Sequence, residues 1–100
     1  MLNVTKKKDG SEKLCIGLEG RLDTVTAPQF EGEIKSALEG ITELVIDAGK
    51  LEYISSAGLR VLLSAQKIMS KQGSMTVKNV SEEVNEIFEV TGFSDILTIV

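Results

Sequence analysis

LVIDAGKLEYISSAGLRVLLSAQK, residues 44–67, joins a short apolar run to a long amphipathic one through a pair of serines. The first run, residues 41–47, is β-branched and apolar almost throughout, which predicts a strand covered on both faces in the middle of a sheet. From Ser55 or Ser56 onward, apolar residues recur at helical spacing until Gly73. Residues 75–80 then alternate as a strand does, so the stretch predicts a parallel, right-handed strand-helix-strand unit.

Upstream of this unit the pattern predicts a β-hairpin and a helix. Strands are expected over residues 2–7 and 13–19, with a turn around Asp9-Gly10. The helix begins where Thr26 and Gln29 have the spacing of a capping box and Pro28 is tolerated in the first turn. Gly40 is expected to close it. The helix's apolar stripe consists of Phe30, Ile34, Ala37, Leu38 and Ile41.

Downstream, a third helix is expected from Ser81, because a serine cap precedes two acidic residues that complement the helix dipole. Gly92 ends this helix, Phe93 is expected to pack in the core, and residues 95–100 can supply a last short strand. The predicted order is β-β-α-β-α-β-α-β, a single α/β domain over residues 1–100 with a central mixed β-sheet.

Composition excludes several function classes. The chain has 100 residues and a net charge of −4, and its one basic run, Lys6-Lys7-Lys8, is expected to be a solvated strand end, so direct nucleic-acid binding is not predicted. The single cysteine, Cys15, lies in an apolar run and is expected to be in the core. No apolar stretch approaches the roughly 20 residues needed to cross a bilayer. We therefore expect a soluble, cytoplasmic protein without membrane insertion.

Catalytic chemistry has little support. The chain contains no histidine to activate a serine, and neither Ser55 nor Ser56 begins a serine-x-x-lysine motif. No phosphate-binding glycine loop is present. The scattered carboxylates Asp23, Asp47 and Glu52 have no histidine or cysteine near them in the sequence that could complete a metal site. No catalytic residue, metal site or cofactor is predicted.

The position of the two serines is more informative than their reactivity. They lie between a buried strand and a helix, at the sheet edge where open α/β domains usually engage ligands and partners. Either serine can be an N-cap, worth about 1 kcal/mol, but one cap does not require two serines. A phosphate on the other would meet the free N–H groups and the positive end of the helix dipole, so the site can act as a switch for binding.

Residues 44–67, together with GLEGRLDTVTAPQFEGEI upstream and VTGFSDILTI at the end, resemble the STAS domain, specifically the stand-alone bacterial anti-sigma factor antagonists. The resemblance covers essentially the whole chain. It implies a partner-switching protein that, when unphosphorylated, binds an anti-sigma factor that is also a serine kinase, and so frees a sigma factor. Phosphorylation of the loop serine ends the association, and a serine phosphatase resets it.

The resemblance places the phosphoacceptor on Ser56 rather than on Ser55, and an aspartate near the phosphorylation loop on Asp23. Gly58 would allow close backbone approach in the first helical turn. Many antagonists have aspartate immediately before the phosphoserine, whereas this chain has Ser55, and Ala57 follows where a second hydroxyl is frequent. The implied partner-binding residues are Asp23, Tyr53, Ser55, Ser56, Ala57, Gly58 and Leu59.

Two of these residues have an alternative role. Asp23 can simply cap the loop before the first helix, since aspartate readily accepts backbone N–H groups in turns. Leu59 fits the core as well as it fits a docking surface, by its helical spacing.

Two other functions stay open. A small STAS subunit can dock on the ATPase of a bacterial lipid transporter without any phosphorylation of the serine. An enzyme would need an activity that depends on Ser56 without histidine.

Overall fold

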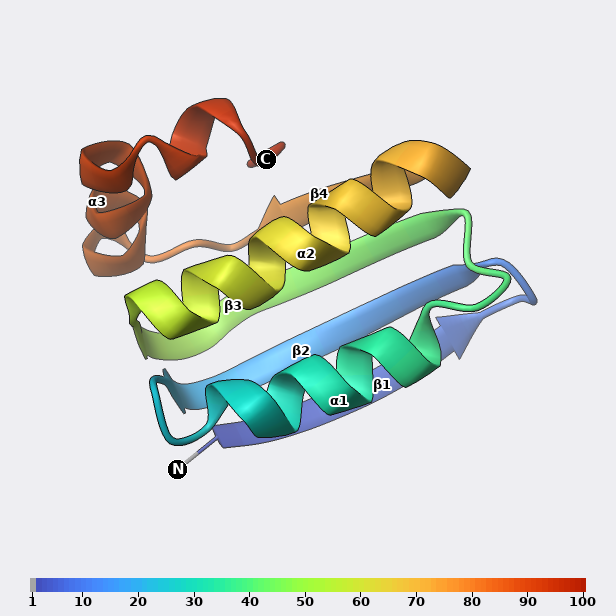
Figure 1. The fold of residues 1–100 in the computed structure, drawn as a ribbon, viewed down its shortest axis with the longest axis horizontal. Coiled ribbons are helices and arrows are strands. Elements are labelled where there is room, and N and C mark those ends of the chain that lie inside the picture. Colours follow the sequence, from blue (N-terminus) through green and yellow to red (C-terminus); the bar gives the residue numbers. More distant parts are fainter. Residues whose placement is uncertain (1) are drawn as a thin grey trace.

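The computed structural model describes residues 2–100, which form a four-stranded sheet with two helices, α1 and α2, packed across one face (Figure 1). A third helix, α3, lies beyond the carboxyl end of the last strand. The elements are β1 (Leu2–Asp9), β2 (Lys13–Leu22), α1 (Ala27–Ala37), β3 (Glu43–Ile54), α2 (Ser56–Gln72), β4 (Ser74–Lys78), α3 (Glu82–Thr91) and the short 3₁₀ helix η1 (Phe93–Asp95).

The sheet has the strand order β1-β2-β3-β4. β1 and β2 form the expected antiparallel hairpin, whereas β2 with β3 and β3 with β4 are parallel pairs. The predicted mixed sheet and its parallel strand-helix-strand unit are therefore confirmed. The parallel arrangement brings the carboxyl ends of β2 and β3 side by side, where the loops to α1 and α2 begin (Figure 1).

Only one face of the sheet is buried. Along β3, Leu44, Ile46 and Ala48 are at most 1% exposed, while Val45 and Asp47 on the opposite face are half-buried. The prediction that this strand is covered on both faces is wrong, because α1 and α2 pack on the same face. Cys15 lies on the open face, paired with Val45, and is half-buried rather than in the core as expected.

β3 continues well beyond the apolar run that revealed it. It extends to Ile54 as a 12-residue strand, with register shifts against β2 that mark irregular pairing. Bulges bend a strand and increase its twist, so the sequence AGKLEY remains extended although it does not alternate regularly. This extension carries the chain directly to the serine pair.

The helix boundaries follow local signals except in α1. This helix ends at Ala37 with Leu38 as its C-cap, so the expectation that Gly40 closes it is wrong. Gly73 caps α2 by donating its N–H to the Met69 carbonyl, and α3 begins at the Ser81 cap and ends at Gly92 in the left-handed conformation. The capping box at the start of α1 is wrong. The Thr26 hydroxyl donates to the Arg21 carbonyl at 2.9 Å and makes no cap bond to α1, although Pro28 lies in the first turn as expected.

The expected last strand is also wrong. Residues after α3 form η1, and only Ile99 then makes a single parallel bridge to Val77 of β4. Its two hydrogen bonds, from the Val77 N–H to the Thr98 carbonyl and from the Val100 N–H to the Val77 carbonyl, are too few to make a strand. Phe93 packs against the core as predicted.

Candidate functional site

Ser55 is the N-cap of α2. Its backbone is extended, with φ −95° and ψ 175°, and its hydroxyl oxygen accepts the Gly58 N–H at 3.4 Å. Its own N–H donates to the Leu22 carbonyl at 2.8 Å, which ties the end of β3 to the end of β2. The helix cap and the junction between the two strands thus depend on the same residue.

Ser56 is the first residue of α2, and its side chain is exposed. Among the hydrogen bonds of residues 2–100, none uses the Ser56 hydroxyl. The first N–H groups of a helix lack intrahelical partners, so this hydroxyl stands beside positive partial charge. The structure separates the roles of the serine pair, because one caps the helix and the other faces solvent.

Gly58 lies in the first turn of α2, where the helix touches the strand ends. A Cβ placed there would lie 2.6 Å from Leu22 Cγ and 2.9 Å from Ile54 Cγ1. The expected close backbone approach is therefore confirmed, because no side chain fits at this position. Gly58 and Leu59 are both buried, Leu59 with 4% of its surface exposed, so in this structure they lie beneath the turn rather than on its surface. They hold the exposed turn in place from beneath.

Asp23 organises the loop between β2 and α1. Its Oδ1 accepts the backbone N–H groups of Val25 and Thr26, each at 3.0 Å, and the Thr26 hydroxyl at 3.2 Å. The N–H of Thr26 is the main reason that the pKa of the Asp23 carboxyl is below its ordinary value. The alternative role, capping of this loop, is thus present in the structure. The half-buried side chain also leaves part of the carboxylate accessible.

An arginine that the sequence analysis did not single out joins the ends of β2 and β3 to the loop that follows β2. The Arg21 guanidinium lies over the Tyr53 ring, with Cζ 4.5 Å from the ring centroid. Its Nε is 4.0 Å from Asp23 Oδ2. The two strands place Arg21 and Tyr53 opposite each other, after the register shift. No sequence pattern gives that register, so this contact could not have been found from the sequence.

A shallow hollow of about 200 Å³ lies between the first turns of α1 and α2, next to the serine pair. Ala57, half-buried, lies on its wall, and Arg60 from the second turn of α2 contributes a charged side chain. Of the predicted partner-binding residues, Asp23, Tyr53, Ser55, Ser56 and Ala57 keep accessible surface, and we call these five the Ser56 surface. The hollow is lined by Thr24, Ala27, Pro28, Glu31, Ala57, Arg60 and Val61.

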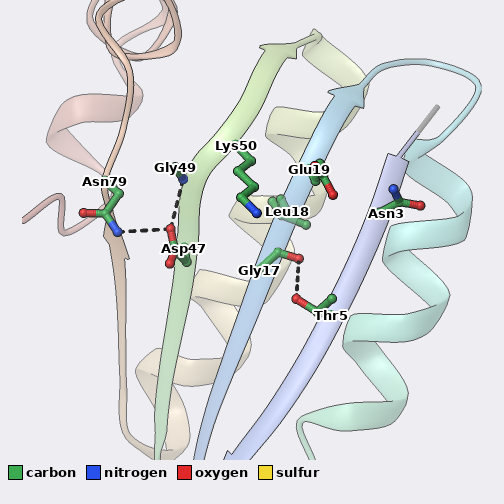
Figure 2. Close-up of a pocket in the computed structure, with 9 residues that line it drawn as sticks. All are labelled: Asn3, Thr5, Gly17, Leu18, Glu19, Asp47, Gly49, Lys50 and Asn79. Atoms are coloured by element: carbon green, nitrogen blue, oxygen red, sulfur yellow. Dashed lines mark hydrogen bonds between the residues drawn. The ribbon is translucent and has the colours of Figure 1, made fainter.

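A larger hollow, of about 430 Å³, lies on the open face of the sheet, seen in Figure 2 with the helices behind the strands. Asp47 Oδ1 accepts the Gly49 N–H at 2.9 Å and the Asn79 amide at 3.1 Å, and these bonds lower the pKa of its carboxyl. Asn79 has a left-handed backbone, with φ 60°. The Asp47 carboxylate thus supports a bend in β3 and the turn after β4, which is a structural role.

Within residues 2–100, no three histidine, cysteine or carboxylate side chains come close enough to hold a metal ion. No helix over the same range is long and apolar enough to span a membrane.

Comparison with known proteins identifies relatives. A family described as "Mlab, STAS domain" matches residues 6–99. The chain is 38% identical to BtrV of Bordetella bronchiseptica, a protein named as a proposed anti-sigma factor antagonist. The match covers 93% of this chain and 80% of BtrV. It is 29% identical to the anti-sigma-B factor antagonist of Bacillus subtilis, over 98% of this chain and 90% of that protein.

The fold is shared with solved structures as well. The phosphorylated form of the Bacillus cell fate determinant SpoIIAA superimposes with a TM-score of 0.75 at 19% identity, covering 98% of this chain and 91% of that one.

Proposed function

Because this chain belongs to the STAS domain family, we propose that it is an anti-sigma factor antagonist controlled by phosphorylation of Ser56. In the unphosphorylated form it binds an anti-sigma factor and so releases a sigma factor. The observation that carries this function is the division of the serine pair, since Ser55 is engaged as a cap while the Ser56 hydroxyl is exposed and without a partner among residues 2–100. Relatives named as antagonists, at up to 38% identity, support it.

The fold tolerates the modification. A kinase would transfer the γ-phosphoryl group of ATP to Ser56 Oγ, with release of ADP and of the hydroxyl proton, and leave nearly two negative charges at the start of α2. Anions at this end of a helix are stabilised by about 0.3–1 kcal/mol. Since the side chain already points to solvent, the phosphate displaces no core group. Phosphorylation is thus expected to change what binds there and to leave the fold intact.

The proposed partners are an anti-sigma factor that is also the serine kinase, and a serine phosphatase that acts on the phosphorylated form. The Ser56 surface would contact the anti-sigma factor, with the Ser55 cap and the buried Gly58 and Leu59 positioning it. The chain itself acts by binding and not as an enzyme. Its lack of histidine leaves both serines without the usual general base, which supports this assignment.

A capture experiment tests the proposal. Wild type, Ser56→Ala, Ser56→Asp and a matched control, Ser70→Asp, are used as baits in lysate of the native host. Ser70 is also exposed on α2 but lies at the other end of the helix, so its variant adds the same charge away from the Ser56 surface. We expect wild type, Ser56→Ala and Ser70→Asp to retain one anti-sigma factor kinase, and Ser56→Asp to bind it at least about tenfold more weakly, because an unpaired buried charge costs several kcal/mol. Equal retention by Ser56→Asp would refute the switch.

The captured kinase then assigns the modified serine. With ATP it should label wild type and Ser55→Ala, but not Ser56→Ala. Labelling of Ser56→Ala with none of Ser55→Ala would move the phosphoacceptor to Ser55.

The second candidate is a small STAS subunit that docks on a transporter ATPase. The observation in its favour is the description of the matching family, "Mlab, STAS domain", which does not mention an antagonist. Capture of the same transporter ATPase by wild type and Ser56→Asp would favour this function, with the serine pair serving chiefly to start α2.

A further inference from the structure

Arg60 is a charged side chain of the site that the proposed function leaves without a role. It lies in the second turn of α2, is exposed, and lines the hollow between α1 and α2 beside Ala57. The ion pairs within residues 2–100 involve Lys6, Lys13, Arg21 and Lys35 but not Arg60. Glu31 lines the same hollow but makes no ion pair with Arg60, so the arginine fork is available for an anion.

The spacing along α2 places Arg60 within reach of a group on Ser56. The two residues are four apart on one helix, which places their Cβ atoms about 5–6 Å from each other. Helical side chains lean toward the N-terminus, so a long side chain at Arg60 covers the turn that contains Ser56. The arginine and the proposed phosphoacceptor thus share one face of the helix.

The other cations of the region are less well placed. Arg21 is already engaged by the Tyr53 ring and by Asp23. Lys67 is the next cation along α2, 11 residues beyond Ser56, which corresponds to roughly 16 Å along the helix axis. Arg60 is therefore the one positive side chain on α2 that can reach a group on Ser56.

We propose that Arg60 binds the phosphate monoester of Ser56 and holds it against α2. This rests on the proposed function only in taking Ser56 as the modified residue. Two N–H groups of a guanidinium match two phosphate oxygens in a bidentate pair, a geometry that lysine cannot reproduce. In the phosphorylated form, Arg60 would leave the hollow and turn to the phosphate, so the surface offered to a partner would change in shape as well as in charge.

The test measures the second pKa of the phosphate, which is ordinarily near 6. Phosphoserine is incorporated at position 56 during synthesis, so that no kinase or partner is needed, and the phosphate is titrated by ³¹P NMR. Arg60→Gln is compared with wild type and with Lys67→Gln, which removes the same charge from an exposed position on the same helix. Asp23 and Glu31, the carboxylates that face this region from the β2–α1 loop and α1, are kept in all variants.

If Arg60 binds the phosphate, Arg60→Gln should raise the phosphate pKa by at least about 0.3, a twofold change, because an ion pair at this spacing favours the dianion by roughly that factor. Lys67→Gln should leave the pKa unchanged, and Arg60→Lys should give an intermediate value. Equal pKa values for wild type and Arg60→Gln would overturn the proposal. A failed capture experiment would refute the proposed function without affecting this result, since the phosphoserine is introduced independently of any partner.

Discussion

The glycine beneath the serine pair offers a stringent test of how the site is built. In Gly58→Ala, the new methyl group would lie 2.6 Å from Leu22 Cγ, 2.9 Å from Ile54 Cγ1 and 3.0 Å from the Leu22 carbonyl oxygen. Both side chains are at most 1% exposed, and the carbonyl accepts the Ser55 N–H. None of these three groups can move away without disturbing the core or the junction between β2 and β3.

Two opposing effects set the magnitude. Alanine is favoured over glycine within a helix by about 1 kcal/mol, whereas forcing a methyl group into a packed site costs about 1–3 kcal/mol. Since the methyl would meet two neighbours at distances that real contacts essentially never show and a third at a tight 3.0 Å, we expect the upper part of that range and a net loss of about 1–2 kcal/mol. For a domain of this size, the loss corresponds to a fall in Tm of roughly 5–12 °C.

Thermal and urea unfolding measure the effect, with Gly32→Ala as the matched control. Gly32 is also inside a helix, but a Cβ there would meet nothing within 4 Å, so only the helix preference operates. Gly32→Ala should therefore raise the free energy of unfolding by about 0.5–1 kcal/mol. A Gly58→Ala variant as stable as Gly32→Ala would show that α2 can shift away from the strands, and the rigid support proposed for the Ser56 surface would be wrong.

Two further predictions follow from the same geometry. In urea titrations, Ser55→Ala should lower the free energy of unfolding by about 1 kcal/mol because the cap to Gly58 is lost. Ser56→Ala should change it by less than about 0.5 kcal/mol. A larger loss for Ser56→Ala than for Ser55→Ala would contradict the different roles of the two serines. The pKa of Asp23 is lowered in the folded state. Its carboxylate therefore stabilises the fold at pH values above the pKa of the unfolded chain, and this contribution disappears as the pH falls through the pKa of the folded state. The stability difference between wild type and Asp23→Asn should accordingly be constant at neutral pH and shrink below about pH 4, and a difference independent of pH would contradict it.

Most of the fold could be predicted from the sequence because its signals are local. Ser81 and Gly92 bound α3 as their chemistry predicts, and the hydrophobic period of residues 55–73 marks α2 along its whole length. The parallel pairing of β3 and β4 follows from a helix between two strands. The position of the serine pair at a strand-helix junction was predicted in the same way, and the structure confirms it.

The remaining features depend on contacts between distant segments. Val45 and Cys15 are left uncovered because α1 and α2 both pack on the other face of the sheet, and no local sequence pattern predicts on which face a helix packs. The Thr26 hydroxyl bonds back to the Arg21 carbonyl at the end of β2, which defeats the capping box expected from its spacing to Gln29. Arg60 is different, because its four-residue spacing from Ser56 is visible in the sequence and acquires meaning once Ser56 is known to be exposed.

The structure also explains why serine can replace the aspartate that commonly precedes the phosphoserine in the antagonists this chain resembles. Aspartate and serine are both good N-caps, and Ser55 supplies the required oxygen to the Gly58 N–H. An aspartate would place one negative charge next to a phosphate that carries nearly two, and like charges in adjacent residues repel. Ser55 keeps the cap without that charge, so in the phosphorylated form that we propose the dipole of α2 and the Arg60 guanidinium would act on the phosphate alone. Serine at position 55 thus preserves the start of the helix and would lower the electrostatic cost of the proposed phosphorylated state.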